Sequence, residues 1–158
     1  MKLILCCILV AVCIYLGIVV ASNLKTKKTF WEDLVKFCEF LSANIGFGQK
    51  KINEVIMDYE ALCSPVCKKV LMDYVAHNNP LLQVCLENFL NREEEQILKE
   101  FFNALGELDV TNELIKIENY RARFLKKYEQ YLDKNNKYAP LTIKLSIIFG
   151  IVICIVFL

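Results

Sequence analysis

The residues with the greatest capacity for chemistry are two cysteines four positions apart, Cys63 and Cys67. Thiolates bind zinc, and His77 and Cys85 could complete a set of four ligands. Against this, Cys63 stands before Pro65, a residue favoured in the first turn of a helix, and no Cys-x-x-Cys or His-x-x-x-His pair is present. Cys67 and Cys85 also suit buried apolar positions. We therefore expect free thiols, with neither a metal nor a cofactor.

The sequence lacks a catalytic signature. His77 is the single histidine, and at the expected end of a helix a protonated imidazole would favour the helix dipole. No serine or cysteine has the local signature of a nucleophile. The Gly46-Phe47-Gly48 stretch lacks the Gly-Lys-Ser/Thr of a phosphate-binding loop. A net charge of +1 also gives no basic field for nucleic acid. The sequence therefore predicts a scaffold or assembly protein that is not an enzyme and has no catalytic residues.

Two groups of charged residues are candidates for binding a partner protein. The acidic group lies at the expected start of a helix, where the helix dipole stabilises it, and the same charges could contact a basic patch. The basic group lies on a helix that leads toward the end of the chain, so anionic lipid is a third possibility for it. The groups are Glu93, Glu94 and Glu95, and Arg121 and Arg123 with Lys126 and Lys127.

Both ends of the chain are long and apolar. Leu3–Val20 has no charged residue, and Leu141–Leu158 has only Lys144, which can extend to the lipid head groups. At about 1.5 Å per residue, each segment is roughly 27 Å long as a helix, close to the thickness of a bilayer core. We expect a transmembrane helix in residues 1–22, a cytoplasmic helical domain in residues 23–138 and a second transmembrane helix in residues 139–158.

A cleaved signal peptide is the alternative interpretation of the first apolar segment. Lys2 supplies a positive start, and Val19-Val20-Ala21-Ser22 resembles a weak cleavage site. However, the apolar run is longer than a usual signal core, and Lys25, Lys27 and Lys28 follow it at once. We favour an uncleaved anchor. The alternative is an exported, tail-anchored binding protein.

The distribution of lysines predicts the orientation in the membrane. The basic residues that flank the two apolar segments lie on the same side, toward the middle of the chain, and only Lys2 lies at the opposite end. The positive-inside rule therefore places the central domain in the cytoplasm and both termini outside. The flanking residues are Lys25, Lys27, Lys28, Lys134, Lys137 and Lys144.

The middle of the chain predicts six short helices in a compact bundle, and no segment shows sustained strand alternation. Capping-box spacing predicts helix starts at Thr29, with Glu32, and at Asn91, with Glu94. Gly106 is expected to close the helix that begins at Asn91. The expected starts are near Thr29, Gln49, Ser64, Pro80, Asn91 and Asp109 or Thr111, and the last helix ends near Asn135, before Pro140. The fold class is therefore all-α, with a transmembrane helix on each side of the bundle.

The order of these features resembles the stage III sporulation protein AB family of endospore-forming bacteria. The similar stretches are Leu41–Val55, Glu95–Gly106 followed by Asp109, and the Lys137-Tyr138 junction before the second apolar segment. The two flanking membrane helices match the layout of that family as well.

This resemblance implies a helical domain similar to the cytoplasmic domain of the type II secretion inner-membrane platform protein. It also implies a place in the mother-cell membrane around the forespore, within a channel complex that links the two cells. The expected partners are the cytoplasmic secretion-type ATPase of that complex, stage III sporulation protein AA, and the other membrane proteins of the channel.

Overall fold

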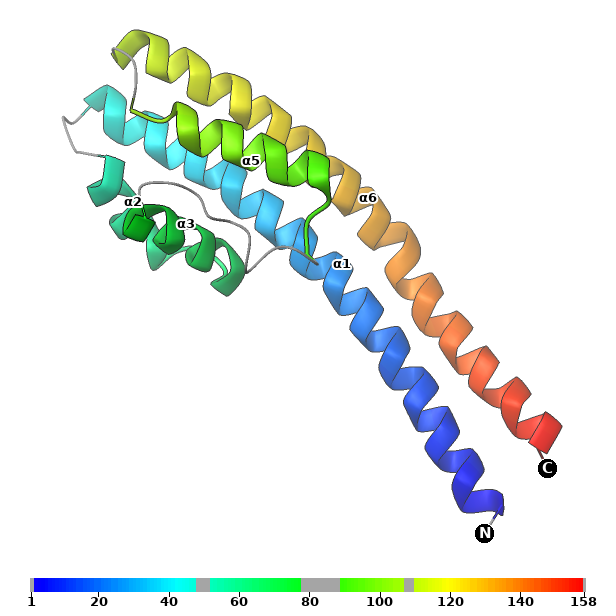
Figure 1. Ribbon diagram of the computed structural model, residues 1–158. Helices are drawn as coiled ribbons and strands as arrows, with labels where there is room; N and C mark the ends of the chain where they lie inside the picture. The colour runs from blue at the N-terminus through cyan, green and yellow to red at the C-terminus, as the bar shows by residue number, and fades with distance from the viewer. Residues whose placement is uncertain (1, 48–51, 78–88, 107–109, 158) are drawn as a thin grey trace. The chain divides into compact units, whose positions relative to one another are not determined.

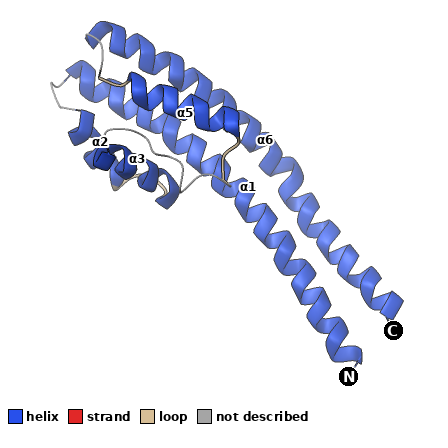
Figure 2. Cartoon of the chain, in the orientation of Figure 1, coloured by secondary structure: helices blue, strands red, loops and turns tan. Residues whose placement is uncertain are grey.

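The computed structural model describes residues 2–47, 52–77, 89–106 and 110–157, and these ranges contain helices and no strand (Figures 1 and 2). The all-α fold class is therefore confirmed for this part of the chain. The helices are α1 (Lys2–Phe47), α2 (Ile52–Glu60), α3 (Pro65–His77), α5 (Arg92–Ala104) and α6 (Val110–Phe157).

The chain divides into two compact units. The anchor unit comprises Met1–Lys28 and Tyr128–Leu158, and the helical domain comprises Thr29–Lys127. The two longest helices, α1 and α6, each contribute one end to the anchor unit and the other end to the helical domain. The membrane boundaries expected at residues 22 and 139 stay predictions.

The helix start expected at Thr29 is wrong. Helix α1 continues through this residue without a break. A capping side chain is needed only where no earlier helical turn supplies carbonyl acceptors for the first amides. Here the preceding turn is helical and includes Leu24, Lys25 and Lys27, residues that favour helices, so it supplies those carbonyls.

The helix end expected near Asn135, before Pro140, is also wrong. Helix α6 contains Pro140 in its interior. A proline removes one backbone hydrogen bond and costs about 3 kcal/mol within a helix. The turns on either side of Pro140 are already helical, however. The helix therefore does not have to nucleate again beyond the proline, a step that would cost additional free energy. On the far side, the Thr142 hydroxyl donates to the Tyr138 carbonyl at 2.8 Å.

The predicted count of six separate helices is not confirmed. The first and last predicted helices of the bundle are parts of α1 and α6 and are continuous with the apolar segments. The helix expected after Pro80 lies outside the described residues. The expected helix that starts at Ser64 is present as α3, with Pro65 as its first residue.

The predicted capping box of α5 is confirmed. The Asn91 side chain accepts a hydrogen bond from the Glu94 amide at 2.9 Å, and the Glu94 carboxylate accepts one from the Asn91 amide at 3.0 Å. Gly106 follows the end of this helix with a φ of 83°, a left-handed conformation in which a glycine has no steric cost. Local sequence signals therefore set both ends of α5.

Aromatic side chains from α1, α5 and α6 form the core of the helical domain. The Phe101 ring lies 5.1 Å from that of Phe124, and the Trp31 ring lies 5.7 Å from Phe124, measured between centroids. Phe37 of α1 contacts Phe101 and Tyr59, so α2 joins the same cluster. Burial of each such ring contributes roughly 1.5–3 kcal/mol of hydrophobic stabilisation. The long helices and the short ones thus share one core.

Candidate functional site

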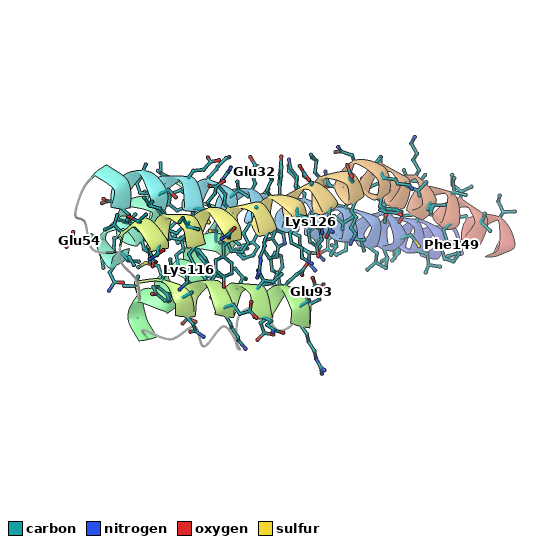
Figure 3. All side chains as sticks on the ribbon, turned by 90° about the horizontal axis from the view of Figure 1, so that it is seen from above. Glu32, Glu54, Glu93, Lys116, Lys126 and Phe149 are labelled. Atoms are coloured by element: carbon teal, nitrogen blue, oxygen red, sulfur yellow. The ribbon has the colours of Figure 1, made fainter. Side chains whose placement is uncertain are left out.

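The apolar ends of α1 and α6 form the first candidate site, a membrane anchor. Both helices are long and apolar enough to cross a bilayer, with 18-residue windows of mean hydropathy 2.1. Only 6% of each window is buried, whereas the core helix of a soluble protein would be mostly buried. Phe149, labelled in Figure 3, is one of the exposed residues, at 63%. These features are compatible with a two-pass membrane protein.

Two glycines allow the anchor segments of α1 and α6 to approach each other closely. A Cβ atom added to Gly17 would lie 2.8 Å from the Cβ of Ser146, which is closer than real side chains approach. Gly150 lies against Val10, where an added Cβ would lie 3.4 Å from the nearest methyl group, at the tight end of ordinary contact. Small residues permit this kind of packing between transmembrane helices, where no hydrophobic force brings helices together.

Basic and aromatic side chains gather where the anchor segments begin. Lys27 and Lys134 both place their ammonium groups near the Tyr131 ring, at 5.5 and 5.1 Å from its centroid. Lys28 lies over Tyr128 at 5.9 Å. A cation–π contact positions the ammonium group of a lysine by attraction to the ring and does not require a hydrogen bond from it. We call Lys25, Lys27, Lys28, Lys134 and Lys137 the lysine collar.

The lysine collar includes five of the six basic residues expected to flank the membrane. Lys137 lies over the Tyr138 ring at 5.5 Å, and Lys25 is exposed. The sixth, Lys144, is exposed one turn beyond Pro140 within the apolar part of α6. The structure adds three tyrosines to the predicted lysines. Tyrosine is enriched at membrane–water interfaces because its ring is apolar and its hydroxyl is polar.

The two units have opposite net charge. The anchor unit has seven lysines and two acidic residues, which gives a net charge of +5. The helical domain has twelve basic and sixteen acidic residues, which gives a net charge of −4. The overall charge of +1 conceals this division. An anionic membrane surface would attract the positive charge of the anchor unit, and a basic surface would attract the negative charge of the helical domain.

The three predicted acidic residues of α5 have different environments. Glu93, labelled at one end of α5 in Figure 3, has a side chain 72% exposed and accepts a hydrogen bond from Lys127 at 2.9 Å. This bond lowers the pKa of Glu93. Glu94 is buried in the capping box, and Glu95 pairs with Lys99 at 2.6 Å. Glu93 is therefore the most exposed of the three carboxylates.

The predicted basic residues of α6 also contact acidic neighbours. Arg121 donates to both carboxylate oxygens of Glu118, at 2.7 and 2.8 Å, and to Glu39 of α1 at 3.1 Å. Its hydrogen bonds to Glu118 raise the pKa of Arg121 and lower that of Glu118. Arg123 is more exposed, with a 3.6 Å contact to Glu100. Binding of a partner by these residues stays a prediction.

Cys63 and Cys67, the two cysteines considered as metal ligands, lie together at the start of α3. Their thiols share a hydrogen bond, which lowers the pKa of Cys63 and, together with burial, holds the pKa of Cys67 well above its usual value. As a thiol, Cys63 also donates to the Glu60 carbonyl, at 3.6 Å from sulfur to oxygen, and as a thiolate it accepts from Cys67. Among the described residues, no three His, Cys, Asp or Glu side chains gather as metal ligands. Cys85 and the side chain of His77 lie outside the described part of the structure.

Two buried carboxylates were not identified from the sequence. Asp33 of α1 is 7% exposed and accepts a hydrogen bond from the Ser64 amide at 2.8 Å, so it caps α3 from another helix. Glu113 of α6 is 4% exposed and accepts one from the Gly106 amide at 2.9 Å. The sequence does mark Asp33 as unusual, because it is a charged residue that interrupts the apolar face of α1 beside Leu34. Its hydrogen-bond partner, however, lies 31 residues away in the chain.

The family model for stage III sporulation protein AB matches residues 2–158, essentially the whole chain. No curated protein matches the chain. No solved structure matches it either.

Proposed function

The chain belongs to the stage III sporulation protein AB family, and we propose that it is a membrane-anchored assembly component that docks a cytoplasmic secretion-type ATPase during endospore formation. Membership of the family implies a role in sporulation. In our proposal the protein lies in the mother-cell membrane around the forespore, within the channel complex. Its direct partner is stage III sporulation protein AA, and its role is structural, without catalysis.

One observation carries the proposal: α1 and α6 each run without a break from an apolar anchor segment into the core of the helical domain. A domain tethered by two such helices stays at the membrane surface. A partner that binds it there is recruited at a high effective concentration, so each individual contact can be weak.

Two observations support the proposed arrangement in the membrane. The lysine collar bears on the orientation, and the continuity of α1 bears on whether the first anchor is retained. The collar favours the cytoplasmic side for the ends of the anchors that join the helical domain. Helix α1 is unbroken at Ala21 and Ser22, where a signal peptidase would have to cut. Both observations favour retained anchors over the exported, tail-anchored alternative.

The charge of the helical domain supports a basic docking face on the ATPase. The domain has a net charge of −4, and Glu93 projects a largely exposed carboxylate. Complementary charge increases the rate of association and fixes the orientation of the partners. The proposed contacts are Glu93 and Glu95 of α5, with Arg121 and Arg123 of α6.

The proposal is tested by capture of the purified ATPase on the full-length protein in detergent micelles. We expect the wild-type protein to retain the ATPase and Glu93→Arg to weaken retention, because the change places like charge against a basic face. Glu54→Arg on α2 is the matched control, because Glu54 is also an exposed acidic residue of the domain. Failure of the wild-type protein to retain the ATPase would contradict the docking role, and equal retention by all three would contradict the proposed surface.

A further inference from the structure

We propose that the anchor unit binds one anionic phospholipid with a hydroxylated head group, such as phosphatidylglycerol. The head group would occupy a hollow lined in part by Lys134 and Lys137 of the lysine collar. An acyl chain would lie along an apolar groove on the same face of α6. This inference goes beyond the proposed function and uses only its premise that the anchors lie in a membrane.

The hollow has a volume of about 630 Å³ and is open to the surroundings. Two ammonium groups, from Lys134 and Lys137, provide donors for a phosphodiester. The Lys134 side chain is positioned by Tyr131 and the Lys137 side chain by Tyr138, through the cation–π contacts described above. The complete lining is Asp133, Lys134, Asn136, Lys137 and Tyr138.

The other polar groups of the hollow select among lipids. Asp133 accepts hydrogen bonds and carries a negative charge, so it suits a head group with hydroxyl donors and disfavours additional phosphates. Asn136 can donate to a hydroxyl oxygen and accept from a hydroxyl hydrogen. A choline head group has no donor for either residue. Phosphate and hydroxyl recognition together match a glycerol head group.

The apolar groove begins one helical turn farther along α6. It has a volume of about 550 Å³ and lies between the anchor segments of α1 and α6. Its lining is almost entirely apolar, as an acyl chain requires. The wall from α1 includes Cys13 and Leu16, and the wall from α6 includes Thr142, Leu145, Phe149 and Val152.

The hollow and the groove are aligned along one face of α6. Lys134, Tyr138 and Thr142 succeed one another at four-residue intervals, and Leu145 and Phe149 continue at intervals of three and four. Residues at this spacing lie on one side of a helix. The distance from Tyr138 to Val152 is roughly 21 Å at 1.5 Å per residue, longer than the roughly 15 Å of hydrocarbon in one leaflet. A lipid anchored at the lysines therefore reaches along the groove.

Native mass spectrometry of the full-length protein in detergent tests this proposal. With equal phosphatidylglycerol and phosphatidylcholine present, we expect one phosphatidylglycerol to be retained per chain. Lys134→Gln with Lys137→Gln should reduce retention about tenfold or more, since each lysine near an anionic surface contributes substantially. Lys36→Gln with Lys99→Gln in the helical domain removes the same charge and should leave retention unchanged.

A second variant tests the acyl chain and separates lipid from free phosphate. Leu145→Trp fills the groove and should reduce retention, whereas Ile151→Trp, an exposed residue outside the groove lining, should not. Excess inorganic phosphate should not displace the lipid. Equal retention of both lipids, equal retention by the lysine variants, or displacement by phosphate would overturn the proposal. None of these outcomes affects capture of the ATPase, so the two proposals fail separately.

Discussion

At the scale of single residues, several of the charged side chains that are candidates for binding a partner also form contacts within the helical domain. Glu94 caps α5, and Arg121 joins α6 to Glu39 of α1. A substitution at either residue would alter the domain as well as its surface. Glu93 and Arg123 are more exposed, so they are the better positions for testing a partner.

The capping box gives the first prediction. Asn91→Ala removes the acceptor for the Glu94 amide at the start of α5, and we expect the free energy of unfolding to fall by about 1 kcal/mol. Denaturant unfolding of the full-length protein in micelles measures this change. Asn103→Ala, at an exposed position inside the same helix, is the control and should have almost no effect. An equal loss in both variants would contradict a capping role.

The thiol pair gives the second prediction. Because the hydrogen bond from Cys67 lowers the pKa of Cys63, Cys63 holds more thiolate near neutral pH than an ordinary cysteine. Cys67→Ala removes the donor, so the pKa of Cys63 should rise and its alkylation by iodoacetamide should slow near neutral pH. The alkylation rates of the wild-type protein and the variant should converge at alkaline pH, where Cys63 is ionised in both.

Peptide mass spectrometry gives the alkylation rate of Cys63 at each pH. Cys38→Ala is the matched control, because Cys38 is also a buried cysteine and does not contribute to the pKa of Cys63. The assigned hydrogen bond would be wrong if Cys67→Ala left the pH profile unchanged.

At the scale of helices, local signals predicted α3 and α5 well and failed where two expected helices merge. The Asn91 capping box and the Pro65 start depend on residues within one turn, so the sequence contains all that decides them. At Thr29 and Pro140 the outcome depends on whether the neighbouring turn is already helical, a cooperative property that a short motif does not report.

The contact between the anchor segments gives the third prediction. A disulfide should form between Val10→Cys and Gly150→Cys on oxidation, in a background without other cysteines, because these positions are in van der Waals contact. Gly17→Leu should lower the yield severalfold, since its side chain would overlap Ser146 and separate the helices.

Gly46→Leu is the control for this experiment. An added Cβ at Gly46 meets no atom within 4 Å, so the cross-linking yield should not change. The yield is measured by the shift in mobility of the linked chain after protease cleavage between the helices. A yield that is insensitive to Gly17→Leu would show that the close approach is not required.

At the scale of the whole molecule, the two units differ in both charge and polarity. The sequence predicted two apolar ends with lysines beside them, because hydropathy and charge are properties of composition along the chain. It did not predict the contacts of Lys27 with Tyr131 and of Lys28 with Tyr128, or the Asp33 carboxylate that caps α3, because these contacts join residues far apart in the chain. Long-range pairing thus limited the prediction of the candidate sites.

The labelling of Cys63 in intact sporulating cells tests the central claim most directly. Cys63 is partly exposed in the helical domain, and its lowered pKa makes it reactive. A maleimide that cannot cross membranes should leave Cys63 unlabelled in intact cells and label it after lysis, because the proposed orientation places the helical domain in the cytoplasm. Cys63→Ala is the control for labelling at other cysteines. Rapid labelling of Cys63 without lysis would contradict the account.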